Sequence, residues 1–474
     1  MSEVVEVDIC VIGAGSGGLS VAAGASQLGR STVLIERHRM GGDCLNTGCV
    51  PSKALLAAAK TATAARHAGG FGIGMVAPVV DFAAVRRHVR GVIEAIAPND
   101  SVERFTALGV RVIAGEARFT GHDRVSVGET TIRARRFVVA TGSRPAVPPI
   151  PGLDQVAYLT NETVFDNPVL PDHLIVIGGG PIGVELAQAH RRLGSRVSIV
   201  EAATLLGQDD PELVDVLRRE LRRDEVTLYE NAAVQRVAPN GERITVTLSR
   251  GGDSVVLDAS HLLIASGRRP TIEALDLAAA GIEHGPAGIM VDRRLLTTNR
   301  RVFAIGDVAD GPRFTHVAGY HAGIVIRNAL FRLPAKTDYT ALPHVTYTDP
   351  ELAQVGLTEA EARVKHGVVT VLRWPFHEND RAQAERRTPG FVKVVTTPRG
   401  RILGAGIIGA DAGDLLQVWT LAIGQGLKIG AVANMIAPYP TLGEASKRAA
   451  GSFFMPKLFS DRSRRLVGWL ARLG

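Results

Sequence analysis

Two glycine-rich turns at matched spacing are the feature that most limits how this chain can fold. Each turn follows a short apolar run and precedes a helix-like stretch, and a second apolar run then ends in an acidic residue. The interval from the first glycine to the acid is 36 − 13 = 23 residues in one copy and 201 − 178 = 23 in the other. The glycines and acids are Gly13, Gly15, Gly18 and Glu36 in the first copy, and Gly178, Gly180, Gly183 and Glu201 in the second.

This arrangement is typical of dinucleotide binding. The glycines let the backbone and a helix N-terminus approach a pyrophosphate, and the acid accepts hydrogen bonds from a ribose. The chain therefore predicts two Rossmann-like units. At the second unit, a carboxylate at Glu201 repels the extra phosphate of NADP, and residues 202–208, "AATLLGQ", offer no Arg to bind it. NADH is therefore favoured over NADPH.

Length and charge set the wider limits. The 474 residues are too many for one core and predict two to four domains. Although the net charge is +7, Lys and Arg are spread along the chain, so no nucleic-acid partner is expected. The N-terminus carries acids where an export signal carries basic residues, and no apolar run reaches about 18 residues. With three cysteines in all, a reducing cytoplasm is the expected location.

Cys44 and Cys49 lie in the stretch "GGDCLNTGCVPSK", directly after the first nucleotide unit. A structural zinc site needs two more ligands, and the nearby His38 leaves the set one short, so no resident metal is expected. Residues five apart in a helix have Cα atoms about 8 to 9 Å apart, whereas a disulfide needs less than about 7 Å. A bridge would distort the helix start, which Gly48 and Pro51 permit, and would close too short a loop to be an effective staple. A redox pair is the interpretation we favour.

With these residues the chain resembles the class I pyridine nucleotide-disulfide oxidoreductases, which include lipoamide dehydrogenase, glutathione reductase and mercuric reductase. The resemblance extends over nearly the whole chain. Four further stretches are similar to family motifs in the same order: "FVVATGSRPAVPPIPG" (137–152), "LLIASGRRPT" (262–271), "TTNRRVFAIGDV" (297–308) and "VTYTDPELAQVGLTEAEA" (345–362).

The resemblance implies an α/β fold with two Rossmann-like dinucleotide-binding domains, one for FAD and one for NAD, and a C-terminal α+β dimerisation domain. The protein would be a homodimer. The implied limits are 1–148 for the first part of the FAD domain, 149–269 for the NAD domain, 270–338 for the second, central part of the FAD domain, and 339–474 for the interface domain with its tail.

The resemblance also assigns roles to individual residues. Cys49 would be the charge-transfer thiol near the flavin, and Cys44 the interchange thiol that attacks the substrate. Lys53 matches the family's lysine beside the flavin, and Glu185 matches the glutamate that pairs with it. The cofactor-binding positions outside the two glycine turns would be Gly42, Thr141, Gly142, Arg268 and Asp307, of which the last would hold the ribityl chain.

The chain departs from the family at the catalytic base. Disulfide-reducing members have a His-Pro-Thr motif with a Glu five residues after the His, whereas "YPTLGE" has Tyr439 in the His position and keeps Glu444. Tyrosine, with a pKa of about 10 against about 6.5 for histidine, accepts a thiol proton poorly near neutrality. The tyrosine is similar to that of mercuric-reductase-like homologues, but no cysteine follows Cys49 to form a C-terminal pair. The candidate substitutes for the base are His316, His321, His344 and His377.

Three other segments give simpler expectations. Cys10 lies in an apolar strand and is interpreted as a packing residue. The polar run "FHENDRAQAE" (376–385) is interpreted as a solvated turn rather than an interface lining. The tail is predicted to form a basic amphipathic helix that docks on its own protein, with weak peripheral membrane contact as the alternative. Its apolar face would consist of Leu466, Trp469, Leu470 and Leu473.

We therefore predict a flavoprotein enzyme that passes electrons from NADH through FAD to a Cys44–Cys49 disulfide, and from there to a disulfide or metal-ion acceptor. Two alternatives stay open. In a diaphorase, the reduced flavin would serve quinones directly, so that Cys44→Ser would keep turnover. In a flavin-bearing redox sensor or complex subunit, the cysteine pair would alter a binding surface instead.

Overall fold

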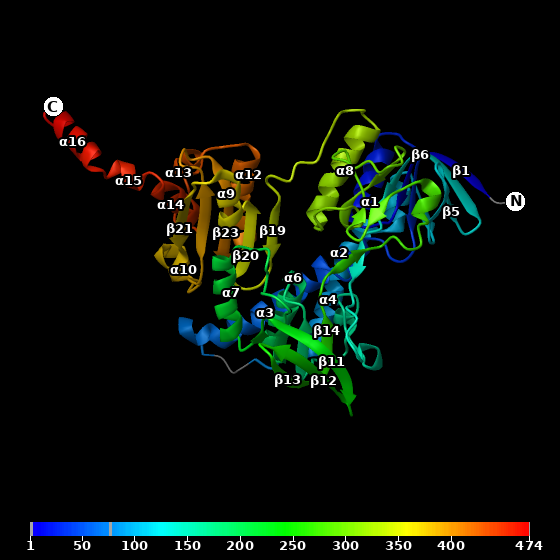
Figure 1. The fold of residues 1–474 in the computed structure, drawn as a ribbon, viewed down its shortest axis with the longest axis horizontal. Helices are drawn as coiled ribbons and strands as arrows, with labels where there is room; N and C mark the ends of the chain where they lie inside the picture. Colours follow the sequence, from blue (N-terminus) through cyan, green and yellow to red (C-terminus); the bar gives the residue numbers. More distant parts are fainter. Residues whose placement is uncertain (1–2, 75–77, 474) are drawn as a thin grey trace. The chain divides into compact units, whose positions relative to one another are not determined.

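The computed structural model describes residues 3–74 and 78–473. The chain divides into two compact units (Figure 1). The first comprises Met1–Gly178, Ala189–Val200 and Ala232–Thr337, and the second comprises Gly179–Gln188, Glu201–Asn231 and Asp338–Gly474.

A seven-stranded sheet organises the N-terminal part of the first unit. Four strands run parallel in the order β3 (Val110–Ala114), β2 (Thr32–Glu36), β1 (Val4–Ile12) and β6 (Thr130–Val139). The short β18 (Val302–Ala304) pairs with β6 in parallel, and β5 (Arg124–Val127) and β4 (Arg118–Gly121) extend the sheet antiparallel. Val33, Leu34 and Ile35 of β2 form a buried apolar run because both faces of the sheet are covered there.

The helix after the first glycine turn covers one of these faces. It is α1 (Ser16–Gln27), and it packs against α8 (Thr315–Ala329), which comes from a segment about 300 residues later in the sequence (Figure 1). Leu19 and Val21 of α1 share a buried cluster with Ile324 and Val325 of α8. This packing places the N-terminus of α8 in the same layer as the first nucleotide unit.

The second glycine turn lies between two further parallel strands. The unit consists of β8 (His173–Ile177), α6 (Pro181–Leu193) and β9 (Arg196–Val200). A further parallel strand, β14 (His261–Ile264), pairs with β8 on the side away from β9. An antiparallel sheet of β11 (Ala232–Asn240), β12 (Arg243–Arg250) and β13 (Asp253–Ala259) follows in the chain. Both predicted strand-helix-strand units are therefore confirmed.

The second unit contains a five-stranded antiparallel sheet. Its order is β19 (Pro343–Thr346), β20 (Glu351–Gly356), β23 (Ile402–Gly409), β22 (Phe391–Thr396) and β21 (Thr370–Pro375). Every residue of β23 is buried. The buried Trp419 of α12 (Gln417–Gly424) donates its indole N–H to Ser446 of α14 (Glu444–Ser452) at 3.0 Å, which attaches both helices to this core. The predicted α+β character of this region is confirmed.

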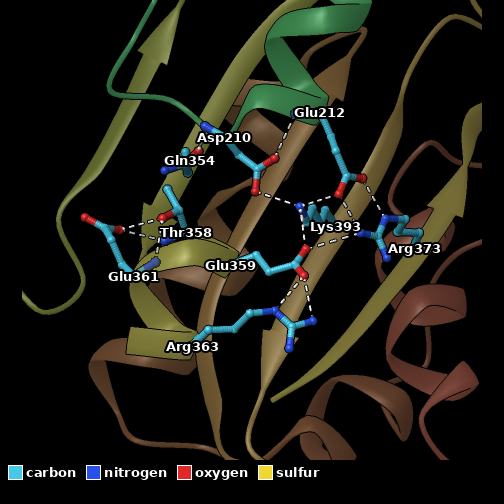
Figure 2. A network of polar contacts seen from close by, with 9 residues as sticks. All are labelled: Asp210, Glu212, Gln354, Thr358, Glu359, Glu361, Arg363, Arg373 and Lys393. Carbon is cyan, nitrogen blue, oxygen red and sulfur yellow. Dashed lines mark hydrogen bonds and ion pairs between the residues drawn. The ribbon is translucent and has the colours of Figure 1, made fainter. Parts of the chain in front are cut away.

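A buried lysine joins three segments of the second unit (Figure 2). Lys393 of β22 is 3% exposed, and its ammonium group lies 2.7 Å from Asp210, 2.9 Å from Glu212 and 3.0 Å from Glu359. These carboxylates stand at the starts of α7 (Pro211–Arg223) and α9 (Glu359–His366). Arg373 of β21 pairs with Glu212 at 2.6 Å and with Glu359 at 3.3 Å. The burial of Lys393 is tolerated because its charge is fully paired.

The tail forms the predicted helix but does not dock. It comprises α15 (Met455–Leu458) and α16 (Asp461–Leu470), which extend away from the sheet of the second unit in Figure 1. The prediction that the apolar face packs on this chain is wrong, because no described part of the chain covers it. The face is 48–67% exposed at Leu466, Trp469, Leu470 and Leu473. Within the described ranges, no helix is long and apolar enough to cross a membrane.

Candidate active site

The two cysteines lie on consecutive short helices rather than on one. Cys44 belongs to α2 (Gly42–Asn46), and Cys49 is the first residue of α3 (Cys49–His67). Thr47 and Gly48 form a break between the two helices, so the Cα spacing of a single regular helix does not apply to this pair. A Cβ atom on Gly48 would lie 2.9 Å from the Asp43 carbonyl oxygen, so the break leaves no room for a side chain there. Both cysteines are free thiols, with Cys44 half-buried and Cys49 exposed.

The surroundings of the pair shift the pKa values of the two thiols in opposite directions. The hydrogen bond from Cys44 is the main cause that lowers the pKa of Cys49 to about 6. The Thr315 hydroxyl, 3.3 Å from the Cys49 sulfur, and the charge of Lys53 lower the same pKa further. The hydrogen bond to Cys49 and partial burial raise the pKa of Cys44. Cys49, at a helix N-terminus, is therefore the thiolate near neutrality, and Cys44 keeps its proton.

Thr315 was not among the predicted site residues. It begins α8 and stands 266 residues from Cys49 in the chain. Only the packing of α8 against α1 brings it to the thiol, so no local motif could have identified it.

A chain of polar contacts links the cysteine segment to the Asp307 loop. Asp43, next to Cys44, pairs with Arg268 at 3.0 Å. The Arg268 guanidinium donates to the Ser143 hydroxyl at 2.7 Å, and Ser143 donates to Asp307 at 2.7 Å. Arg268 thus has protein partners of its own, and its assignment to cofactor binding stays a prediction, as does that of Asp307.

The two glycine turns share their backbone geometry. The first glycine of each turn has a positive φ, +102° at Gly13 and +115° at Gly178. A Cβ atom on Gly13 would collide with the Ala140 carbonyl oxygen, and one on Gly178 with that of Ala265. Ala140 follows β6 and Ala265 follows β14, the strands that pair with β1 and β8. In both copies this neighbouring segment lies so close to the turn that only glycine fits.

The two acids repeat the same hydrogen bonds. Glu36 accepts from the backbone N–H groups of Ala14 at 2.7 Å and His38 at 2.8 Å. In the second copy, Glu201 accepts from Gly179 at 2.7 Å and Ala203 at 2.8 Å. Both carboxylates are therefore held at the end of their strand, as the ribose-binding position of a dinucleotide unit requires.

Three further glycines show that this backbone suits a dinucleotide. A Cβ atom on Gly42 would lie 2.7 Å from the Gly15 Cα, so the segment that carries Cys44 begins directly on the first turn. Gly142 and Gly180 would each present a Cβ to open space, which leaves room for a ligand beside both turns. The Thr141 hydroxyl donates to the Thr271 carbonyl at 2.7 Å. The first turn and the cysteines are thereby parts of one site.

The predicted Lys53–Glu185 pair is not tested by these contacts. Lys53 donates to the Ser52 hydroxyl at 3.4 Å in the first unit. Glu185, which is buried, accepts from the Tyr347 backbone N–H at 2.9 Å in the second unit. The pairing stays a prediction, because the two residues belong to different units.

Tyr439 is a hydrogen-bond donor. It is 71% exposed, and its hydroxyl donates to Asp380 at 3.0 Å. This bond raises the pKa of Tyr439, and the charge of Glu444 adds to the rise. The phenol therefore stays protonated at neutral pH and cannot accept a thiol proton.

The polar run that carries Asp380 is only in part the solvated turn that the sequence indicated, because most of its polar side chains are exposed but the segment forms short helical turns with buried anchors. Phe376 and Asn379 are buried, and the Asn379 amide donates to the Thr441 carbonyl at 3.0 Å. Asn379 also caps the short helix α10 (Asp380–Ala384). The segment therefore positions the partner of Tyr439.

Three of the four candidate histidines have partners or are buried, whereas the fourth, His377, is exposed. Burial lowers the pKa of His321 to about 4, and its neutral ring accepts the Gly306 N–H at 3.1 Å. His344 lies 2.8 Å from Asp209, and His316 stacks on Phe314. Cys10 is fully buried and burial raises its pKa, so its interpretation as a packing residue is confirmed. Among the described residues, no three His, Cys, Asp or Glu side chains cluster as a metal site.

Comparison with known proteins agrees with this geometry. Residues 7–322 match the model of the pyridine nucleotide-disulphide oxidoreductases, and residues 342–450 match their dimerisation domain. A mercuric reductase from Streptomyces lividans is 38% identical, with 94% of this chain and 96% of that protein covered. A dihydrolipoyl dehydrogenase from Bacillus subtilis is 35% identical over the same shares.

A solved structure has the same fold. The Cu(II) complex of the HOCl-induced flavoprotein disulfide reductase RclA from Escherichia coli is 28% identical and superposes with a TM-score of 0.84, covering 93% of this chain and 99% of that one.

Proposed function

Because this chain belongs to the pyridine nucleotide-disulphide oxidoreductase family, whose members are FAD-dependent enzymes that use NAD(P)H, we propose that it reduces a soft metal ion with electrons from NADH. The match to the dimerisation domain supports a homodimer. Bound FAD supplies two-electron transfer between the nicotinamide and the thiols. Oxidation of the Cys49 thiolate and the Cys44 thiol to a disulfide releases two electrons and the one proton of Cys44, and the metal ion accepts the electrons.

The observation that carries this proposal is the contrast between a poised thiolate and an absent base. Cys49 is held as a thiolate, with Cys44 as its protonated neighbour. Exchange with a disulfide substrate requires a group that passes a proton to the leaving thiol. Tyr439 is a protonated donor to Asp380, so it cannot first accept the thiol proton that it would have to pass on. A soft metal ion binds thiolates directly and leaves no thiol to be protonated, so these residues suit it better.

We propose NADH as the electron donor because of Glu201. Its carboxylate is held by two backbone N–H groups at the position where NADP would place a phosphate. Replacement by Gln removes the charge and keeps the shape. We expect Glu201→Gln to raise the KM for NADH and to lower that for NADPH, whereas a chain selective for NADPH would show little change in the ratio.

The test of the acceptor is NADH oxidation by the purified holoenzyme. The acceptors are Hg(II) with excess thiol, lipoamide, glutathione disulfide and a quinone. We expect Hg(II) to give the fastest turnover, and Cys44→Ser to lose at least about a hundredfold of it. Cys10→Ala is the matched control, because Cys10 only packs in a strand.

Each other outcome has a defined meaning. Faster turnover with lipoamide or glutathione disulfide would make the acceptor a disulfide and would contradict the metal-ion proposal. Turnover with the quinone alone, equal in the wild type and in Cys44→Ser, would show a diaphorase and remove the thiols from the electron path.

A further inference from the structure

The tail presents two surfaces of different chemistry. With about 100° of rotation per residue, Leu466, Val467, Trp469 and Leu470 of α16 fall within an arc of about 160°. Arg464 and Arg465 lie on the opposite side. These four apolar side chains are 48–64% exposed. Apolar residues of α15 and its neighbours are exposed as well, at Phe454, Met455, Leu458 and Phe459. An unpartnered apolar surface of this size calls for an occupant.

The charge of the tail indicates what that occupant is. Residues 454–473 contain five basic residues and one acid, Asp461, for a net charge of 5 − 1 = +4. The basic residues are Lys457, Arg462, Arg464, Arg465 and Arg472. Asp461 approaches Arg464 only to 4.0 Å at the surface, so it neutralises little of this charge. The complementary surface is therefore anionic.

A second copy of this chain fits the tail poorly. The match to the dimerisation domain ends at residue 450, before the tail begins. The chain as a whole also carries a net charge of +7, so another copy presents the same sign of charge. Nucleic acid is anionic but offers no match for an apolar arc that includes Trp469. An anionic lipid surface satisfies both faces, because it accepts apolar side chains at the acyl boundary and basic ones at the headgroups.

We propose that residues 454–473 lie on an anionic membrane surface. Leu466, Trp469 and Leu470 enter the boundary between headgroups and acyl chains, and Arg464 and Arg465 remain among the headgroups. Arg462, on the apolar side, reaches the headgroups by extending its long side chain. One short helix binds weakly, but a homodimer carries two tails, so the second binds at a high effective concentration.

The experiment is flotation of the full-length holoenzyme with vesicles of phosphatidylcholine alone or with about 30% phosphatidylglycerol. We expect binding to the anionic vesicles at least about tenfold stronger, weakening as salt is added. Trp469→Ser combined with Leu470→Ser keeps every charge and should lose most of the binding. Arg464→Glu with Arg465→Glu should lose it as well. Val364→Ser, at a position 91% exposed on α9, is the control and should bind as the wild type does.

Two readouts keep the proposal separate from the proposed catalytic function. Dimer mass by light scattering and turnover in solution should be unchanged in both double variants. Absence of wild-type binding would overturn the proposal. Equal binding by Trp469→Ser/Leu470→Ser would reduce it to general attraction of a basic protein, and dissociation of the dimer in that variant would show that the tail is a subunit contact.

Discussion

The Lys393 network and the Cys44–Cys49 pair both hold a charged group with neighbouring side chains, but they leave that group in opposite situations. Three carboxylates surround Lys393, which is almost inaccessible. The Cys49 thiolate is stabilised by one thiol, one hydroxyl and the charge of Lys53, and it is exposed. Strong electrostatic coupling therefore does not by itself mark a reactive site. A charged group that is stabilised but still accessible does.

The largest expected effect is on the reactive side of this comparison. Cys49→Ser removes the thiolate and should reduce NADH-dependent turnover with the preferred acceptor by at least about a thousandfold. The thermal midpoint should change little, because the side chain is exposed. Steady-state kinetics and a thermal melt of the same holoenzyme preparation test both halves. Turnover that survives would place the electron exit elsewhere.

Lys393→Met should show the reverse pattern. It leaves the buried Asp210 and two further carboxylates without their shared cation, at a cost of about 3 kcal/mol or more. The thermal midpoint should fall by about 5 °C or more, while turnover per folded dimer stays normal. Arg363→Met is the control at the exposed rim of the network, where Arg363 pairs with Glu359 at 2.8 Å, and it should cost about 0.5 kcal/mol. Equal falls of the thermal midpoint in Lys393→Met and Arg363→Met would contradict the distinction between the buried centre of the network and its exposed rim.

Thr315 sharpens the comparison, because it should tune reactivity without affecting stability. Alkylation of Cys49 should accelerate as the pH rises through about 6, since the thiolate forms there. Thr315→Val removes the hydroxyl and should move this midpoint up by about one pH unit, the value of a hydrogen bond to a charged group. Thr315→Ser should keep it. Mass mapping of the labelled cysteine gives the alkylation rate at each pH. One shared pH profile for the wild type and both variants would refute the role of Thr315.

The smallest effect concerns acid. Hydrogen bonds from Arg373 lower the pKa of Glu212 to about 2. The folded value lies below the unfolded one, so the Glu212 charge stabilises the fold above about pH 4.5, and this stabilisation is lost as the pH falls toward 2. When the pH is lowered from 5 to 3, the thermal midpoint of Glu212→Gln should fall by about 1 to 2 °C less than that of the wild type. The same substitution at the exposed Glu242 should leave the wild-type slope unchanged.

The nucleotide units were predictable because their signals are local. Apolar strands, glycine spacing and terminal acids lie within residues 4–36 and 173–201, and Glu36 and Glu201 make the same backbone contacts. Thr315 and the Lys393 network were not predictable, because each joins segments that lie far apart in the chain. The differences from the sequence-based expectations have the same origin. Amphipathicity predicted the tail helix but not what covers it, and the packing of residues 376–385 depends on distant Thr441.

The contact between Gly42 and Gly15 limits how this enzyme can be re-engineered. A side chain at Gly42 would meet the Gly15 Cα, a main-chain atom that no second substitution can trim away. A library aimed at the thiols should therefore leave that junction untouched and vary position 315, where side-chain chemistry can change while the backbone stays in place.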